Sequence, residues 1–224
     1  MYHLDSQEEW NAIHPDDLWV YNKLFLSQKL GYLCGPVGVP VPHPDTYIVR
    51  PMFNLLGMGR FARLEWIYKT TDHFHPSEFW CEVFEGDHIS VDFYQKSPIL
   101  TVLGMREPEN PLYKWSRWEK IEKNIEFPKI LTNLSGNYDY INCEFIGNRL
   151  IEVHFRQNPD FRYDNDVAIP VWDDDKKQNY ENLKFIEDKD YLRKGFFIEK
   201  RDSNPVKSSD LTKSGEQNGK TLGS

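Results

Sequence analysis

The sequence predicts an α+β fold built mainly from antiparallel sheets. Residues 141–156, INCEFIGNRLIEVHFR, alternate apolar and polar side chains on both sides of a Gly-Asn turn signal, which predicts a β-hairpin. Residues 79–95, FWCEVFEGDHISVDFYQ, predict two more strands around a Glu-Gly-Asp turn. Residues 16–33 place apolar side chains at helical spacing after two candidate caps, Asp16 and Asp17.

Length and composition allow one good-sized domain or two small lobes. The chain has 224 residues, 39% of them hydrophobic, which is enough for a real core. No apolar run approaches the roughly 18 residues of a membrane span, so we expect no membrane partner. The formal charge of -8 argues against general nucleic-acid binding, although a local basic pocket would not show in the total.

The N-terminus and the cysteines predict a cytoplasmic protein. Residues 1–10 carry acidic side chains and no apolar signal segment. Cys34, Cys81 and Cys143 are an odd number without metal-binding spacing, which is typical of reduced thiols.

The elements are expected in the following order. Residues 1–15 form an N-terminal arm, and the helix of residues 16–33 ends at glycines before the proline-rich loop GPVGVPVPHP. A strand at 47–50 leads through a glycine-containing loop to a return strand at 61–68. Further elements are a strand at 96–104, a charged loop at 105–111 and a helix at 127–134, and residues from about 203 on lack apolar side chains and are expected to be disordered.

Two segments keep alternative interpretations. Residues 79–95 are either an ordinary hairpin with its apolar residues in the core or a connection with a binding role. The aromatic and basic segment YKWSRWEKIE favours a solvated edge over a nucleic-acid stripe, because it carries charges of both signs.

The hairpin of residues 141–156 places chemically active side chains on one face. Successive strand residues point to opposite sides, so Asn142 and Glu144 share a face on the first strand, and Glu152, His154 and Arg156 share one on the second. Carboxylate and amide oxygens on neighbouring strands suit Mg²⁺, and an arginine would neutralise a phosphate. The alternative is an exposed sheet face whose polar residues only meet water.

The chain resembles the ATP-grasp superfamily over roughly residues 17 to 170. The motifs NKLFLSQKLGY, GVPVP, YIVRP and NLLGMGR occur in the family's order. The strand EVHFR resembles the family's Glu-x-Asn-x-Arg strand, with His154 replacing the Asn. The segment EVFEGDHISVD resembles its adenine-binding hinge. The resemblance extends to compact ATP-grasp-like proteins of marine tailed phages, which would place the chain in a host cytoplasm.

The resemblance implies a domain at residues 16–200 with two lobes, about 40–80 and about 81–200, around ATP, followed by a disordered tail at 201–224. It implies nucleotide contacts from all of the following residues: Lys23, Arg50, Gly57, Gly59, Glu82, Val83, Phe84 and His88.

The resemblance also implies the metal and the reaction. Glu152, with Glu144 or Asn142, would hold Mg²⁺, while His154 suits Mn²⁺ better. The reaction would join a carboxylate to an amine through an acylphosphate, with Arg50 and Arg156 stabilising its anionic groups. The alternatives are a nucleotide-binding or partner-binding protein that has lost catalysis, and a β-rich scaffold that binds no nucleotide.

Overall fold

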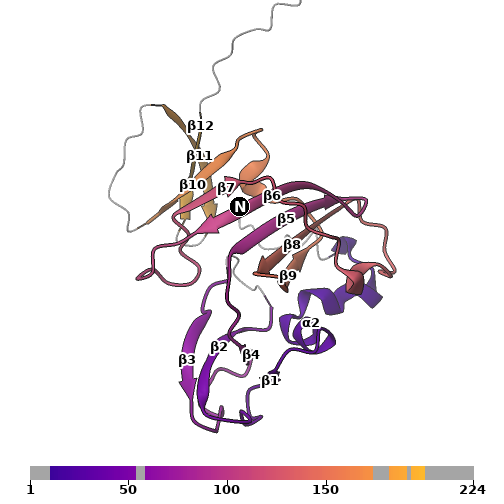
Figure 1. Ribbon diagram of the computed structural model, residues 1–224, viewed down its shortest axis with the longest axis vertical. Helices are drawn as coiled ribbons and strands as arrows, with labels where there is room; N and C mark the ends of the chain where they lie inside the picture. The colour runs from indigo at the N-terminus through magenta and orange to yellow at the C-terminus, as the bar shows by residue number, and fades with distance from the viewer. Residues whose placement is uncertain (1–10, 54–58, 174–181, 191–192, 200–224) are drawn as a thin grey trace, which may run out of the picture.

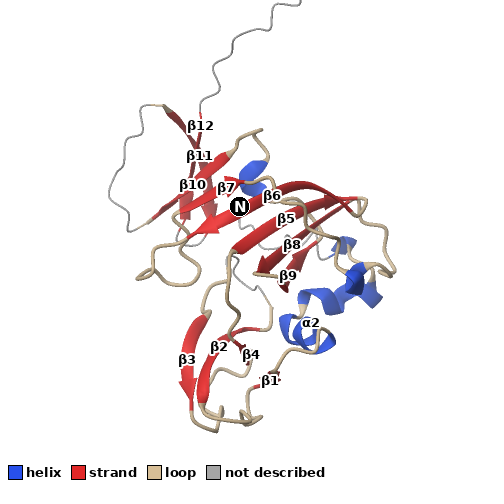
Figure 2. Ribbon diagram, viewed as in Figure 1, coloured by secondary structure: helices blue, strands red, loops and turns tan. Residues whose placement is uncertain are grey.

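The fold is α+β, as the sequence predicts, with two antiparallel sheets and a few short helices (Figures 1 and 2). It comes from a computed structural model that describes residues 11–53, 59–173, 182–190 and 193–199. The predicted tail at 201–224 and most of the predicted arm therefore lie outside the described residues. None of the helices in the described ranges is long and apolar enough to cross a membrane.

The smaller sheet has four strands in the order β1-β4-β2-β3, all antiparallel. Its strands are β1 (Cys34–Pro36), β2 (Asp45–Pro51), β3 (Arg63–Ile67) and β4 (Glu78–Glu82). One face packs on a core under the proline-rich loop, with Tyr47, Val49 and Trp80 at its centre. The other face carries Phe79 and Cys81 and packs against Leu24 of the first α-helix.

The larger sheet has eight strands in the order β11-β12-β10-β7-β6-β5-β8-β9. Its strands are β5 (His88–Tyr94), β6 (Ser97–Met105), β7 (Arg117–Lys120), β8 (Tyr140–Ile146), β9 (Arg149–His154), β10 (Val167–Trp172), β11 (Leu183–Asp190) and β12 (Arg193–Glu199). The main core lies on one face of β5, β8 and β9, where Val91, Cys143 and Val153 are fully or almost fully buried.

The predicted helix of residues 16–33 is wrong in extent, because the chain forms two short helices instead. These are η1 (Pro15–Tyr21), a 3-10 helix, and α2 (Lys23–Lys29). Asn22 breaks the run by taking an extended conformation and capping α2 through hydrogen bonds to the backbone N–H groups of Leu24 and Phe25. Asp17 is buried and does not cap a helix, since its carboxylate accepts hydrogen bonds from the loop at 135–138.

The predicted helix at 127–134 is also shorter than expected. Only η2 (Lys129–Leu131) forms, a 3-10 turn that follows Pro128 in an extended conformation. A further 3-10 turn, η3 (Pro159–Phe161), follows β9. The strands predicted at 61–68, 79–95 and 96–104 are confirmed as β3, β4, β5 and β6 within two residues at their ends.

Residues 83–87 connect the two sheets, so the hairpin interpretation of residues 79–95 is wrong. β4 pairs with β1 and β2 in the smaller sheet, while β5 pairs with β6 and β8 in the larger one. The connection lies against the β8–β9 turn. A Cβ on Gly86 would stand 2.8 Å from the Cα of Gly147, and both glycines have positive φ.

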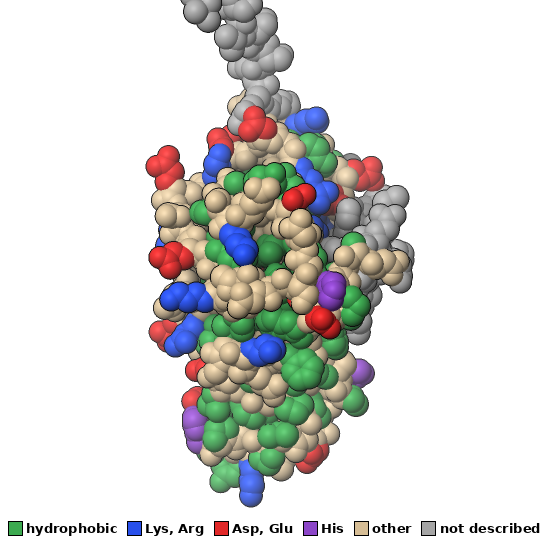
Figure 3. Space-filling view, turned by 90° about the vertical axis from the view of Figure 1, so that its right-hand side faces the viewer, with side chains coloured by type: hydrophobic (Ala, Val, Ile, Leu, Met, Phe, Trp, Pro, Cys, Tyr) green, Lys and Arg blue, Asp and Glu red, His purple; other side chains and the backbone are tan. Residues whose placement is uncertain are grey.

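Charged and apolar side chains are unevenly distributed over the surface. On the face drawn in Figure 3, hydrophobic side chains are dense over the lower half of the molecule, and lysine and arginine side chains are spaced over the upper half. In Figure 1 the lower half contains the smaller sheet and α2, and the upper half contains the larger sheet.

Candidate functional site

The β8–β9 ladder brings the predicted metal ligands together. Asn142 lies opposite His154 and Glu144 lies opposite Glu152 in the register of the two strands. Directly opposed side chains in an antiparallel pair stand about 5 Å apart at their Cβ atoms. The register shifts between Glu144 and Phe145, so that Ile151 is an extra residue on β9.

Glu152 is the centre of a buried charged group, which we call the Glu152 cluster: Lys23, Glu152 and His154. The Lys23 Nζ lies 3.0 Å from Glu152 Oε2, and the His154 Nε2 lies 3.2 Å from Oε1. Burial alone would raise the pKa of Glu152, but the Lys23 charge and the His154 hydrogen bond hold it well below its ordinary value. Glu152 is therefore a carboxylate in the folded protein.

Lys23 reaches Glu152 because of where α2 begins. It is the first residue of α2, directly after the Asn22 cap, and its side chain is buried. Its backbone N–H donates to the carbonyl oxygen of Met52 at 2.9 Å, just beyond β2. The start of α2 is thus attached both to the end of β2 and to β9.

Arg50 brings a second cation from the smaller sheet to the same place. Its guanidinium is buried, with Nη2 donating to the carbonyl oxygen of Ile151 at 3.3 Å and Cζ lying 5.3 Å from the Phe79 ring. Its Nε–H is buried and finds no hydrogen-bond partner in the described part of the chain. A buried unused donor is costly, and an anion is a partner that would satisfy it.

Glu144 is held more loosely than Glu152. Its Oε2 lies 3.1 Å from the Nε2 of His88, and both side chains remain partly accessible. The His88 ring packs edge-on against Trp115 and Trp118. Glu144 therefore offers an accessible carboxylate beside the buried one of Glu152.

A polar network on β5 fixes the Asn142 amide. The Asn142 Nδ2 donates to Ser90 Oγ and to Asp92 Oδ1, each at 2.8 Å. Asp92 also accepts from the backbone N–H of Asn158 with both oxygens, at 2.9 and 3.0 Å. Burial raises the pKa of Asp92, against the hydrogen bonds from Asn142 and Asn158. The Nδ2 of Asn142 is thus used by β5, and its Oδ1 takes no part in this network.

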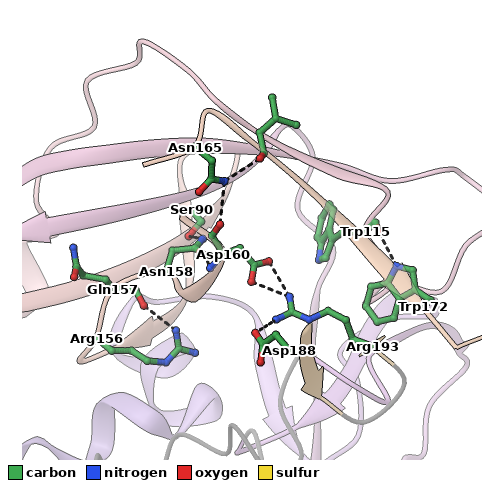
Figure 4. Close-up of polar contacts among 11 residues, drawn as sticks. Ser90, Trp115, Arg156, Gln157, Asn158, Asp160, Asn165, Trp172, Asp188 and Arg193 are labelled. Atoms are coloured by element: carbon green, nitrogen blue, oxygen red, sulfur yellow. Dashed lines mark hydrogen bonds and ion pairs between the residues drawn. The ribbon is translucent and has the colours of Figure 1, made fainter. Parts of the chain in front are cut away.

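Arg156 lies beyond the end of β9, on the turn that leads into η3, so the prediction that it shares the strand face is wrong. Its Nη1 donates to the carbonyl oxygen of Gln157 at 3.2 Å (Figure 4). The strand ends at His154 because the chain turns there toward Asn158, which caps η3 by accepting from the Asp160 N–H. Arg156 remains half-exposed at this turn.

A second buried charged group lies close to this turn, and we call it the Arg193 cluster: Asp160, Asp188 and Arg193. The Arg193 Nη1 donates to both carboxylate oxygens of Asp160, at 2.9 and 2.8 Å (Figure 4). Its Nη2 donates to Asp188 at 2.6 Å. The cluster ties the β11–β12 hairpin to η3.

The residues expected to contact adenine lie where the chain leaves the smaller sheet. The Glu82 N–H donates to the carbonyl oxygen of Leu33, and its carboxylate accepts from the Leu33 N–H, both at 2.8 Å. Val83 is exposed, while the Phe84 ring lies 4.7 Å from Tyr32 with Arg149 over both rings. The aromatic and cationic group of Tyr32, Phe84 and Arg149 was missed by the sequence analysis.

The glycine-containing loop is described only in part. Gly57 lies outside the described residues, and Gly59 has a positive φ of 62° with open space around its missing Cβ. Its contribution to phosphate binding stays a prediction.

The oxygen atoms of these side chains are of the kind that binds a hard divalent cation. Glu144 and Glu152 present two carboxylates on opposed strand positions, and Mg²⁺ typically uses one or two carboxylates together with water and phosphate oxygens. Over the described ranges, no group of three or more His, Cys, Asp and Glu side chains is arranged to hold a metal ion. The ligands therefore have to include oxygens from outside that set, such as the Asn142 amide or a phosphate.

Ser90, Asp92 and the contact that Asn158 makes with Asp92 are the other polar features that sequence reasoning missed. The signal was present for two of them, because Ser90 and Asp92 alternate with apolar residues after His88 and so share its face. Asn158 had no such signal, since only the fold brings the turn after β9 back to β5.

Two solved structures resemble the chain at low sequence identity. One is an ATP-grasp superfamily protein from Archaeoglobus fulgidus, 13% identical with a TM-score of 0.49, and the match covers 82% of this chain and 65% of that one. The other is the ATP-grasp ligase PsnB complexed with a minimal precursor, 16% identical with a TM-score of 0.40, with coverages of 67% and 56%. This chain thus spans less than two thirds of either structure.

Each of these two structures is described as an ATP-grasp protein. No protein-family model matches the chain, and no curated protein matches it significantly.

Proposed function

We propose that this protein binds ATP with a divalent cation at the boundary between its two sheets and uses it to join a carboxylate to an amine. The observation that carries the proposal is the meeting of Lys23 and Arg50 with the opposed Glu144 and Glu152. Two buried cations beside two carboxylates suit a metal–polyphosphate ligand, which brings both signs of charge to one place.

Each residue has a role in this proposal. Arg50 and Lys23 bind phosphate oxygens and offset negative charge as the γ-phosphoryl is transferred. Glu152 and Glu144, with the oriented amide of Asn142, hold the cation, which supplies charge neutralisation and alignment of the phosphates. Mg²⁺ is the first choice for these oxygen ligands, and Mn²⁺ suits the imidazole of His154.

The remaining predicted contacts complete the proposal. Glu82, Val83 and Phe84 lie on the segment expected to meet adenine, with His88 beyond it for the ribose. Arg156, half-exposed on the turn after β9, is the residue we assign to the anionic acylphosphate, an intermediate that requires no protein nucleophile. Gly57 and Gly59 belong to the loop expected to cover the phosphates.

A non-catalytic nucleotide-binding or partner-binding protein is the second candidate. The observation in its favour is that Glu152 is already bound by Lys23 and His154, so the Glu152 cluster is electrostatically complete without a ligand. Such a cluster can hold a fold together whether or not chemistry follows.

Titration calorimetry of ATP with Mg²⁺, with Mn²⁺ and without metal tests ATP binding, which the ligase and a nucleotide-binding protein share. We expect metal-dependent binding that weakens about 10- to 100-fold in Glu144→Gln, because one carboxylate ligand is lost. Glu144 is the better target than Glu152, whose removal takes a carboxylate away from the buried Lys23. The matched control is Glu119→Gln, the same change on β7 at a residue paired with Arg117.

Turnover then separates the two candidates. ADP release that depends on added carboxylate, with capture of the acylphosphate by hydroxylamine, supports the ligase. Binding without ADP release, across broad carboxylate and amine pools, favours the non-catalytic protein. A folded protein that binds no ATP with either metal overturns the ligase and the nucleotide-binding form of the second candidate, and leaves a partner-binding protein.

A further inference from the structure

Cys34 and Cys81 face each other across the smaller sheet. They are direct partners in the antiparallel register of β1 and β4, so their side chains emerge on the same face. Both are free thiols. The third cysteine, Cys143, lies on β8 opposite Val153 and Val91 and has no cysteine beside it in the ladder.

The hydrogen-bond pattern fixes the spacing of this pair. The next residues along the ladder, Glu82 and Leu33, are joined by a backbone hydrogen bond of 2.8 Å. Hydrogen-bonded and non-hydrogen-bonded pairs alternate, so Cys34 and Cys81 form a non-hydrogen-bonded pair, with Cα atoms about 4.5 Å apart. Pro36, two residues further, agrees with this alternation because it has no N–H to donate. This Cα spacing lies within the range that a disulfide spans, about 4.4–6.8 Å.

The two thiols differ in access and acidity. Cys34 is partly exposed and Cys81 is fully buried. A hydrogen bond from the Cys81 thiol, with help from the Arg50 charge, lowers the pKa of Cys34. The same hydrogen bond and burial raise the pKa of Cys81. Cys34 is therefore the thiol that ionises first, and the thiolate is the form that attacks a disulfide.

We propose that Cys34 and Cys81 form a thiol–disulfide exchange site on the face of the smaller sheet that carries Arg50, with low-molecular-weight disulfides such as glutathione disulfide as the co-reactant. Arg50 belongs to the site because, on β2, it pairs with Phe79 of β4, which places its side chain on the same face as Cys81. The site needs no nucleotide, so it stands whether or not the proposed ATP function does.

The exchange takes place in two balanced steps. The Cys34 thiolate attacks one sulfur of glutathione disulfide, forming a mixed disulfide and releasing one glutathione thiolate. Cys81 then loses its proton to solvent and attacks the Cys34 sulfur, forming the Cys34–Cys81 disulfide and releasing the second glutathione. Two protein thiols are oxidised and one glutathione disulfide is reduced to two glutathione molecules.

Intact-mass and peptide mass spectrometry of the full chain, incubated with glutathione disulfide, test the site. We expect wild type to lose the mass of two hydrogen atoms, with Cys34 and Cys81 joined in one cross-linked peptide. The thiol titre in denaturant should fall from three to one, leaving Cys143. Dithiothreitol should restore all three thiols.

Three variants assign the steps. Cys81→Ser should stop at a glutathione adduct on Cys34, Cys34→Ser should remain unmodified, and Cys143→Ser should form the cross-link like wild type. If a variant does not fold, the cross-linked peptide of the wild-type protein is sufficient to test the proposal. A stable glutathione adduct on wild-type Cys34, a cross-link involving Cys143, or three unmodified thiols would each overturn the proposal.

Discussion

The Glu152 cluster and the Arg193 cluster are both buried ion networks, yet they differ in charge balance and in where their residues come from. The Arg193 cluster sets two carboxylates against one guanidinium and joins residues at most 33 positions apart. The Glu152 cluster joins Lys23 to β9, and Arg50 reaches the adjacent Ile151 from 101 positions away in the sequence. An acid-rich cluster repels phosphate, whereas Lys23 and Arg50 attract it. The comparison teaches that charge balance, rather than burial, separates a structural network from a candidate binding site.

The largest expected effect is on the Arg193 cluster. Arg193→Met removes the cation that pairs with the buried Asp160 and the partly buried Asp188, and we expect a loss of about 3–5 kcal/mol in the free energy of unfolding. Chemical denaturation measures it. ATP affinity per folded molecule should stay as in wild type, because no member of this cluster is among the residues that we assign to the nucleotide. A loss of affinity in the folded fraction would contradict the division between the two clusters.

Lys23→Met should show the opposite pattern, with a smaller loss of stability and a larger loss of ATP binding. His154 still contacts Glu152 in this variant, so we expect a loss of stability below about 3 kcal/mol. ATP binding with Mg²⁺ should weaken at least about tenfold, since a cation beside the phosphates is removed. Calorimetry and denaturation on the same preparation report both numbers. Unchanged ATP affinity would mean that the Glu152 cluster, like the Arg193 cluster, only stabilises the fold.

The smallest effect is a difference in pH dependence. The pKa of Glu152 is lowered in the folded protein, so its contribution to stability is fully present above its unfolded pKa of about 4.3 and is lost as the pH falls through the folded value. The stability difference between wild type and Glu152→Gln should therefore be smallest in acid and reach its maximum above about pH 5. Denaturation curves across this range measure the difference, and a gap that widens toward acid would contradict the lowered pKa.

Strand positions and the polar face of the hairpin could be predicted from the sequence, because alternation directly encodes which side a residue faces. Asn142, Glu144, Glu152 and His154 come together as that alternation implies. The break at Asn22 could not be predicted from apolar spacing, because a local hydrogen bond to the backbone overrides it.

Contacts between segments that are far apart in the sequence are the second feature that could not be predicted. The partner of Glu152 is Lys23, and nothing in the sequence states that α2 begins beside β9. The same holds for Asp92 and Asn158, which meet only after the chain has turned back from β9. Arg156 was misplaced because the strand pattern continues in the sequence beyond the point where the turn toward η3 ends the strand.

The close approach of Gly86 to Gly147 restricts how the two sheets can move against each other. Neither position has room for a Cβ, so the end of the 83–87 connection and the tip of the β8–β9 hairpin are expected to move together. Rotation of the smaller sheet then has to be absorbed by the few bonds between Val83 and Glu85. The axis of any such rotation would pass beside Phe84, within this connection.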